Sequence, residues 1–356
     1  MDIPRFTKPL HPATLRSVLS SDLYQRVLRP LLFRFDPEFI HHVALWALKH
    51  AGPFMTPLRP PDDKRNERTV FGVKFPNPVG VAAGLDKNAV ALPAWEALGF
   101  GFVEVGTITA RQQPGNPKPR IFRVPECNAI INRLGFNNDG CDLVADHLRH
   151  LRETGWWPRI PVGINLGKSK VTPMDEAVAD YLLSFERLQH LGDYFVLNVS
   201  SPNTPGLRQL QDRNALEELI RAVQERNADG RPLLVKIAPD LEFDAIEDIL
   251  ALCHSTGLSG IIATNTTLDH SCVPAFRRTQ GGLSGAPLRQ RSTEIVRFIT
   301  SRTSLPVIAV GGIMSADDAM EKFDAGAALI QVYTGFIYEG PGLIRQIVQR
   351  CSGSAE

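Results

Sequence analysis

The stretch YFVLNVSSPNTPG, residues 194–206, begins as a buried strand and ends in a cluster of hydrogen-bonding side chains. Apolar residues up to Leu197 lead into Asn198, Ser200, Ser201 and Asn203, and two prolines stiffen the exit. Ser and Asn beside Pro are ordinary turn residues, so the stretch is consistent with a capped turn before a helix. A catalytic loop at the end of a strand is the alternative interpretation.

The same change from apolar to polar residues recurs along the chain. Short β-rich runs occupy residues 78–84, 101–106, 160–167, 194–200, 232–239, 259–265, 306–312 and 328–335. Helical patterns lie between them, for example at 177–192, 214–227 and 243–257. These strand–helix alternations predict an α/β fold in which a parallel sheet closes into a (β/α)8, or TIM, barrel. Residues 111–135 are longer than one connecting loop requires, and they predict a hairpin inserted over the barrel top.

The composition narrows the class of protein. The chain has 356 residues, of which 43% are hydrophobic, and a formal net charge of +1, so nucleic acid is not an expected partner. Its five cysteines show no C-x-x-C spacing, which indicates reduced thiols instead of a disulfide framework or a metal site. The sequence has no P-loop or G-x-G-x-x-G element. No apolar run reaches the roughly 18 residues of a membrane-spanning helix.

The first part of the chain differs from the rest. We predict a helical extension and linker at residues 1–70 and the barrel at 71–356. Residues 1–60 carry eight Lys/Arg and four Asp/Glu, whereas the whole chain is nearly neutral. No strand is expected before about residue 76, and the charged residues 60–70 read as a linker.

Two helices are expected in this extension. The first, in residues 21–35, is interrupted or restarted at Pro30, and the second, in 36–52, begins near Pro37 and has one apolar face. This face comprises Phe39, Ile40, Val43, Ala44, Ala47 and Leu48. The pair either packs on the barrel or lays its apolar sides on a membrane while its basic side chains meet anionic head groups.

Catalytic groups of a TIM barrel lie at the carboxyl ends of its strands, and every run of this chain ends in polar residues or glycines. So many polar groups would stay unsatisfied unless a polar ligand filled the mouth. Lys236 is expected to point into the barrel, where it forms a salt bridge, acts as a Schiff-base nucleophile or holds an anionic cofactor. Glycine clusters at 281–285, 311–315 and 333–336 favour a phosphate site over simple loop closure.

Taken together, the motifs resemble those of a known family. They are AAGLDKN (82–88), PGNPKPRIFR (114–123), INRLGFNN (131–138), NVSSPNTPGLR (198–208), VKIAPDL (235–241), ATNTTLD (263–269), GGLSG (281–285) and AVGGI (309–313). In order and spacing they resemble the quinone-dependent class of dihydroorotate dehydrogenases over about residues 24–347. The resemblance implies an FMN-containing barrel that oxidises (S)-dihydroorotate to orotate in pyrimidine biosynthesis and passes the electrons to a quinone.

The resemblance also implies roles for single residues. Those that would hold FMN are Ala83, Lys87, Thr107, Asn165, Asn198, Lys236, Thr264, Gly285, Gly312, Tyr333 and Thr334. Those that would hold the substrate are Lys87, Asn132, Phe136, Asn198, Asn203, Asn265 and Thr266. Ser201 would be the catalytic base that removes the proton from C5, while a hydride passes from C6 to N5 of the flavin. A serine hydroxyl is a weak base, so we expect a relay through water or a neighbouring hydroxyl such as Thr204.

Three observations favour the quinone-dependent class. Ser201 stands where the soluble class that this fold resembles has a cysteine, the chain has no cysteine cluster for an iron–sulfur partner, and its N-terminal helices are basic and apolar. The resemblance favours the membrane interpretation of the N-terminal helices. It implies a peripheral protein on the cytoplasmic side of a bacterial inner membrane, held to an anionic surface, with a membrane quinone as partner and no obligate protein partner. The lack of an Arg-rich transit peptide favours the bacterial location. Residues 1–20 receive no role.

Three other functions are considered. One is an FMN barrel that reduces a pyrimidine-like ring with a nicotinamide donor, against which Ser201 and the N-terminal helices argue. Another is a Schiff-base aldolase that uses Lys236, which would be colourless. The third is a ligand-binding barrel without catalytic activity.

Overall fold

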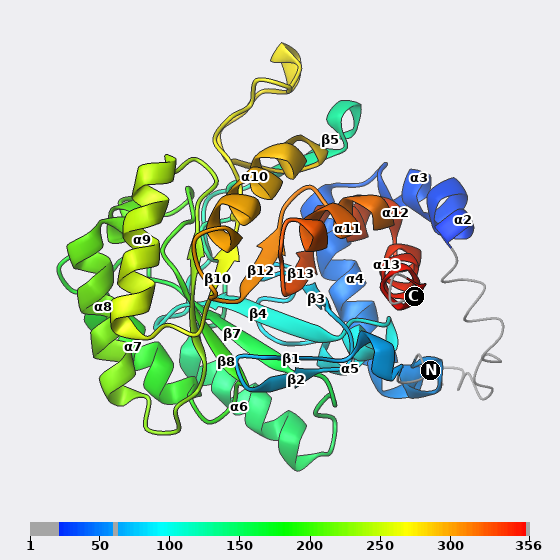
Figure 1. Ribbon diagram of the computed structural model, residues 1–356. Coiled ribbons are helices and arrows are strands. Elements are labelled where there is room, and N and C mark those ends of the chain that lie inside the picture. The colour runs from blue at the N-terminus through cyan, green and yellow to red at the C-terminus, as the bar shows by residue number, and fades with distance from the viewer. Residues whose placement is uncertain (1–20, 60–62, 354–356) are drawn as a thin grey trace.

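The computed structural model describes residues 21–59 and 63–353, and its centre is a closed barrel of eight parallel strands (Figure 1). They are β3 (Val79–Val81), β4 (Phe102–Ile108), β7 (Val162–Leu166), β8 (Tyr194–Asn198), β9 (Leu233–Ile237), β10 (Gly260–Ala263), β12 (Val307–Val310) and β13 (Leu329–Val332). Each pairs in parallel with its neighbours in chain order, and β13 pairs with β3 to close the barrel. The predicted (β/α)8 barrel and all eight predicted strands are confirmed.

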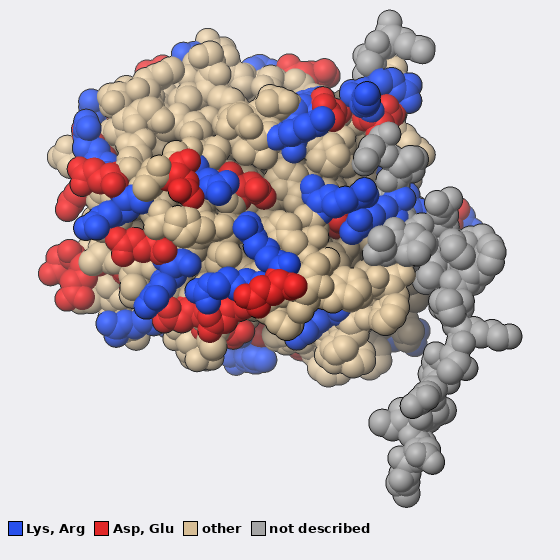
Figure 2. All heavy atoms as spheres, turned by 90° about the horizontal axis from the view of Figure 1, so that it is seen from below, with Lys and Arg blue, Asp and Glu red and all other residues tan. Residues whose placement is uncertain are grey.

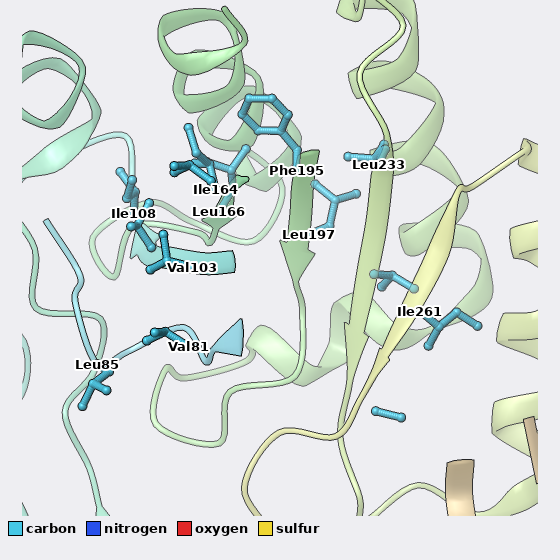
Figure 3. Close-up of a cluster of buried hydrophobic side chains, with 14 of the residues drawn as sticks. Val81, Leu85, Val103, Ile108, Ile164, Leu166, Phe195, Leu197, Leu233 and Ile261 are labelled. Carbon is cyan, nitrogen blue, oxygen red and sulfur yellow. The ribbon is translucent and has the colours of Figure 1, made fainter. Parts of the chain in front are cut away.

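Helices surround the barrel (Figure 1). They are α5 (Leu92–Ala97), α6 (Gly140–Glu153), α7 (Ala177–Leu188), α8 (Arg213–Arg226), α9 (Phe243–Thr256), α10 (Arg289–Thr300), α11 (Ala316–Asp324), α12 (Thr334–Glu339) and α13 (Gly342–Gly353). Figure 3 shows part of the apolar layer of the barrel, in which Val103, Ile164 and Leu197 are completely buried. The strands read as continuous apolar runs because both of their faces are covered.

A hairpin that the sequence analysis did not predict closes the amino-terminal end of the barrel. It consists of β1 (Arg68–Val70) and β2 (Val73–Phe75) in antiparallel pairing, so the expected linker up to residue 70 is wrong for its last three residues. Phe75 is completely buried and lies 5.2 Å from the ring of Phe102, centroid to centroid. Strands of three residues are too short to produce a recognisable period in the sequence.

The predicted insertion over the barrel is confirmed as a hairpin of β5 (Ile121–Val124) and β6 (Ala129–Asn132), joined by the short helix η4 (Pro125–Cys127). A third strand, β11 (Gly282–Gly285), pairs with β6. Most of the glycine cluster at 281–285 is therefore part of a strand instead of the turn that we expected. The strand ends at Gly285, which has a φ of +103° and precedes the next short helix, and Gly281 before the strand has a φ of +141°.

The two predicted N-terminal helices are present. The first is irregular and consists of α2 (Ser21–Leu23), the π-helical turn η1 (Tyr24–Leu28) and α3 (Arg29–Leu32). The turn widens before Pro30, which has no N–H to continue an α-helix. The second is α4 (Pro37–Ala51), capped by the Asp36 side chain, which accepts a hydrogen bond from Phe39 N at 2.8 Å. The short helices η2 (Gly52–Leu58) and η3 (Lys64–Asn66) follow.

The first N-terminal helix is attached to the last barrel unit. Tyr24 donates a hydrogen bond of 2.6 Å to the carbonyl of Ile337, and Arg29 donates one of 3.1 Å to that of Tyr338. Both acceptors lie on α12, directly after barrel strand β13. The extension is thus fixed beside the carboxyl end of the barrel.

Charged side chains of both signs are interspersed over much of the face in Figure 2. Some pair between neighbouring helices, such as Arg187 of α7 with Asp142 of α6 at 3.1 Å and Arg302 with Glu247 at 2.7 Å. Exposed pairs of this kind contribute about 0–1 kcal/mol each, so the apolar layer carries the stability of the barrel.

The closing hairpin provides a test of the fold. Phe75→Ala removes an aromatic ring from the end of the barrel and should lower the free energy of unfolding by about 3–5 kcal/mol, because the cavity cannot collapse between fixed strands. Phe276→Ala is the matched control, since that ring is 78% exposed, and its effect should stay within about 0.5 kcal/mol. Urea unfolding of both variants measures the difference, and equal stabilities would show that the hairpin does not pack as described.

Candidate functional site

A cavity opens at the carboxyl ends of the strands, with about 970 Å³ of space between its atoms. Strands β4, β8, β9, β12 and β13 contribute to its lining, as do the segments directly after β3, β8 and β10 and the inserted hairpin. All residues that the sequence analysis assigned to FMN, substrate or catalysis line this cavity except Asn165. The structure therefore brings together residues from Ala83 to Thr334, which lie far apart in the sequence.

Asn165 lies behind the cavity wall, completely buried. Its Oδ1 accepts hydrogen bonds from Thr107 Oγ1 at 2.6 Å and from Asn198 Nδ2 at 3.1 Å. Its Nδ2 donates to Glu104 Oε1 at 2.8 Å. A carboxylate only accepts, so Glu104 orients the amide of Asn165, which in turn orients two side chains of the cavity wall.

The same chain of amides continues across the cavity. Asn198 Oδ1 accepts from the Ser200 hydroxyl at 3.2 Å and from Asn265 Nδ2 at 3.3 Å. Asn265 Oδ1 accepts from the backbone N–H of Thr266 at 2.8 Å. The ends of β8 and β10 are thereby held in one arrangement at the cavity wall.

The Thr266 hydroxyl is buried and has no hydrogen-bond partner within the described chain. It also belongs to the cavity wall. A buried hydroxyl without a partner is unfavourable, and a polar ligand in the cavity would satisfy it.

Ser201 lies in the loop after β8 and is 6% exposed. Its Oγ accepts a hydrogen bond from the backbone N–H of Asn203 at 3.3 Å, and Asn203 Nδ2 donates to Asn132 Oδ1 of the inserted hairpin at 3.3 Å. No imidazole or carboxylate of residues 21–59 or 63–353 hydrogen-bonds to Ser201. The Thr204 hydroxyl is buried and lacks a partner within these residues, and its role in a relay stays a prediction.

Lys236 points into the barrel as expected and is 4% exposed. Burial lowers the pKa of its ammonium, and the negative charge of Glu104 acts in the opposite direction. Lys236 has no ion pair with a carboxylate of the described residues within 4.0 Å. A direct salt bridge, one of the three roles considered for Lys236, is therefore absent among these residues. The other two, a Schiff-base nucleophile and a cation that holds an anionic cofactor, both concern a bound ligand.

Lys87 is the second cation of the cavity wall, and its Nζ donates to Gly84 O at 2.9 Å. Burial, together with the nearby positive charge of Arg120, lowers its pKa to about 8. The preceding Asp86 holds the loop, because its carboxylate accepts from the N–H of Val90 at 2.8 Å and from Trp95 Nε1 at 3.0 Å. Its lysine neighbour is therefore held at the cavity, where it suits an anionic ligand.

Glycines shape the other end of the cavity. Gly312 has a φ of +73°, and a Cβ there would lie 2.2 Å from the Cα of Arg289. A Cβ on Gly285 would lie 2.3 Å from the carbonyl oxygen of Asn128. Between these glycines, the hydroxyls of Ser284 and Thr334 hydrogen-bond at 2.8 Å. This arrangement of glycines and hydroxyls is typical of sites that hold a phosphate.

The sequence analysis missed several residues of the site. Gln331 lines the cavity, and its Nε2 donates to Glu104 Oε2 at 2.5 Å. Both are polar residues inside otherwise apolar strands, which is the signal that singled out Lys236, so both could have been found. Leu134, Gly135, Ile313 and Met314 also line the cavity, and nothing in their types distinguishes them from core residues.

Comparisons with known proteins agree on one family. The family model described as dihydroorotate dehydrogenase matches residues 66–352. The dihydroorotate dehydrogenase (quinone) of Gloeobacter violaceus is 55% identical over 92% of this chain and 93% of its own. That of a Synechococcus strain is 49% identical over 94% of each chain. A crystal structure of DHODH from Eimeria tenella in complex with ferulenol superposes with a TM-score of 0.81 at 39% identity, covering 88% of this chain and 90% of that one.

The buried carboxylate of Glu104 provides a test of the site. Glu104→Ala leaves the N–H groups of Asn165 and Gln331 without acceptors and the charge of Lys236 without its nearest counter-charge. The free energy of unfolding should fall by about 3–5 kcal/mol. Glu217→Ala, which removes an exposed partner of Arg221, should cost less than about 1 kcal/mol. If denaturant titration gives the two variants similar losses, the network is not a principal support of the site.

Proposed function

The chain belongs to the dihydroorotate dehydrogenase family, and we propose that its barrel cavity holds FMN and dihydroorotate together. Its quinone-dependent relatives match it over nearly their whole length. The protein oxidises (S)-dihydroorotate to orotate, a step of pyrimidine biosynthesis, and a quinone takes up the electrons. The family is flavin-dependent, and FMN is the flavin that we assign to this chain. The observation that carries the assignment of the site is the convergence of the motif residues on one cavity.

The residues around the cavity fit FMN. Gly285, Gly312 and the hydroxyl of Thr334 would hold the phosphate. A side chain at either glycine would collide with neighbouring backbone atoms, so only glycine fits these two positions. Lys236, buried beside Asn198 in the register of β8 and β9, would stabilise negative charge on the reduced ring. When bound, the flavin accepts the hydride from substrate C6 at its N5.

The substrate would lie against the amide side chains at the mouth. Dihydroorotate carries a carboxylate and a cyclic imide, so amides can donate to the first and pair with the second. Asn132 and Asn203 meet there from the hairpin and the β8 loop, and Asn265 and Thr266 follow β10. Lys87 would add a positive charge for the carboxylate, and Phe136 would contribute an apolar wall.

Ser201 would take the proton from C5 of the substrate. Its neighbours in the loop are fixed, since Arg208 donates to the carbonyl of Ser200 at 3.1 Å and Asn203 N donates to Ser201 Oγ. A serine hydroxyl needs an acceptor for its own proton at neutral pH. We propose that this acceptor is water or the buried hydroxyl of Thr204.

The N-terminal extension would attach the protein peripherally to a membrane. Large apolar side chains of this segment are 42–79% exposed, namely Val27, Leu31, Phe35, Phe39, Val43, Trp46 and Phe54. The predicted apolar face of α4 is thus divided, because Leu48 packs on the core while Phe39 and Val43 face outward. No helix in the described ranges is long and apolar enough to cross a bilayer.

We propose that this surface, with the exposed Arg26, Arg34 and Lys49 beside it, lies on the cytoplasmic side of a bacterial inner membrane. An apolar surface with basic flanks binds a membrane through acyl chains and anionic head groups. Residues 1–70 would then serve membrane attachment and quinone access, and 71–356 would perform the chemistry. The first 20 residues lie outside the described chain.

We propose that a quinone approaches the cavity from the side of α4. Glu38 forms a buried ion pair with Arg120 of the inserted hairpin, at 2.7 Å. One turn later, burial and the positive charge of Lys87 lower the pKa of His41 to about 3, so its imidazole is neutral. Since Lys87 also lines the cavity, a quinone that enters along α4 would approach the flavin from this side.

The assignment predicts a yellow protein with flavin absorbance that bleaches when dihydroorotate is added without air. Ser201→Ala should keep the flavin and slow the bleaching by roughly 100-fold or more, because a general base contributes about that much. Ser301→Ala, on the barrel exterior, is the control and should bleach like the wild type. Stopped-flow absorbance measures both rates.

Other outcomes of this experiment favour other functions. Turnover of dihydroorotate with NAD and not with a quinone would contradict the quinone-dependent class. A colourless protein that borohydride traps on a carbonyl substrate would support the aldolase. Background turnover in both wild type and Ser201→Ala would support a binding protein.

The membrane surface can be tested apart from the chemistry. The double variant Phe39→Ser, Trp46→Ser should weaken binding to vesicles of phosphatidylcholine and phosphatidylglycerol by roughly tenfold or more, because two apolar side chains no longer leave water. Leu183→Ser on α7 is the control, as Leu183 is 45% exposed away from the extension. Vesicle co-sedimentation measures binding, and anaerobic bleaching should be unchanged. Equal binding of all three proteins would contradict this surface.

A further inference from the structure

Lys322 is a completely buried lysine to which the function described above gives no role. It lies on α11, and its Nζ donates hydrogen bonds to the carbonyl of Arg289 at 2.8 Å, to Ser292 Oγ at 2.6 Å and to Thr293 Oγ1 at 2.5 Å. All three of its N–H groups are thus taken by neutral oxygens. A buried ammonium without a hydrogen-bonded carboxylate is costly, and burial lowers its pKa to about 8.

The nearby acidic groups are occupied elsewhere. Asp318 accepts from Arg289 Nη1 at 2.7 Å and from the N–H of Met314 at 3.0 Å. Glu321 lies 3.6 Å from Arg289 Nε. Both raise the pKa of Lys322 by their charge, but neither hydrogen-bonds to it within the described residues. The ammonium therefore lacks a direct counter-ion.

One hydrogen bond further on, Lys322 reaches the glycine end of the cavity. Ser292 accepts from Lys322 and uses its own hydroxyl proton to donate to the carbonyl of Gly311 at 2.8 Å. Gly311 and Gly312 both line the cavity. Asp318 holds the same loop from the other side through Met314. The lysine thus lies directly behind the loop, within two hydrogen bonds of the cavity wall.

Two cations line the cavity wall, and neither is assigned to its glycine end. Among its lining residues the cations are Lys87 and Lys236, which we assign to the substrate and to the ring of the flavin. The glycine end contributes backbone and hydroxyl groups. A phosphate dianion there would still benefit from a positive charge in a medium that screens weakly.

We propose that Lys322 is a positioning residue for the phosphate of the flavin: it orients Ser292 against the Gly311 loop and places a positive charge behind the phosphate. The ligand it serves is a flavin phosphate ester, and not a flavin without phosphate. This inference rests on the proposed function, because it takes FMN as the occupant of the cavity. Lys322 acts through the loop and touches neither the substrate nor the reacting atoms.

The test compares FMN with riboflavin, which has the same ring and no phosphate. The full chain, freed of flavin, is titrated with each, and quenching of flavin fluorescence gives both dissociation constants. Lys322→Met should weaken FMN binding by at least roughly tenfold, because a unit charge acts over several ångströms in a weakly screening medium. Riboflavin binding should change much less, because it lacks the charged group.

Lys168→Met is the matched control. Lys168 is 3% exposed and also donates to backbone carbonyls, those of Ser169 and Thr172, but it does not line the cavity. Loss of this lysine should leave the ratio of the two dissociation constants unchanged. If Lys322→Met does not fold, Glu321→Gln provides a second test of the charge effect, because Glu321 is partly exposed. By removing a negative charge near Lys322, it should strengthen FMN binding relative to riboflavin roughly two- to threefold.

The outcomes separate the two proposals. A wild-type protein that binds riboflavin as tightly as FMN would overturn FMN as the cofactor. A wild type that prefers FMN, with Lys322→Met weakening both flavins by the same factor, would overturn the inference alone, since this is the result of a purely structural lysine. An unchanged ratio in Glu321→Gln would likewise speak against a charge effect.

Discussion

The carboxylate of Glu104, buried inside the barrel, is the group on which the arrangement of the site depends. Because it can only accept, it turns the amides of Asn165 and Gln331 toward itself with their N–H groups. The oxygen of Asn165 must then face Thr107 and Asn198, and this decides which atoms of these side chains are left for a ligand. One buried charge thereby determines the donor pattern of a wall built from several strands.

The cost of that charge is shared with the cations around the cavity. Glu104 supports the protonated state of Lys236, whose burial acts against it. The charges of Glu38 and Asp86 support the protonated state of Lys87, and that of Arg120 opposes it. No carboxylate is among the lining residues of the cavity. The cavity therefore has an excess of buried positive charge, which two anionic ligands, a flavin phosphate ester and a carboxylate substrate, would neutralise. Such ligands would offset the cost of burying two lysines in this wall.

How much the sequence predicted depends on the length and regularity of each signal. The eight barrel strands and their polar ends were predictable, because each apolar run is bounded by turn residues and the carboxyl ends of parallel strands must converge. The hairpin of β1 and β2 was not, since Val70 and Phe75 belong to strands of three residues. The sequence also did not show that only part of the apolar face of α4 packs on the barrel. The helical period places Phe39 and Leu48 on the same side of the helix, but it does not indicate which of the two is buried by a neighbouring element. The family resemblance gave Asn165 its predicted role, yet its place behind the wall follows only from its contacts.

The surroundings of Ser201 restrict where its proton can go. Asn198 Oδ1 already accepts hydrogen bonds from Ser200 and Asn265, and Asn265 Oδ1 accepts one from Thr266. These amide oxygens are therefore poor acceptors for the proton of Ser201. Within the described residues, the hydrogen bonds from Glu104 lead through Asn165 and Asn198 to Ser200 and not to Ser201, and amides do not relay protons readily. Arg208 and Lys87 are positive and repel a proton. The loop after β8 therefore leaves water at the cavity mouth or the free hydroxyl of Thr204 as acceptors. As the proposed base, Ser201 would depend on one of these acceptors, and both belong to the surroundings of the loop 200–206 more than to the barrel.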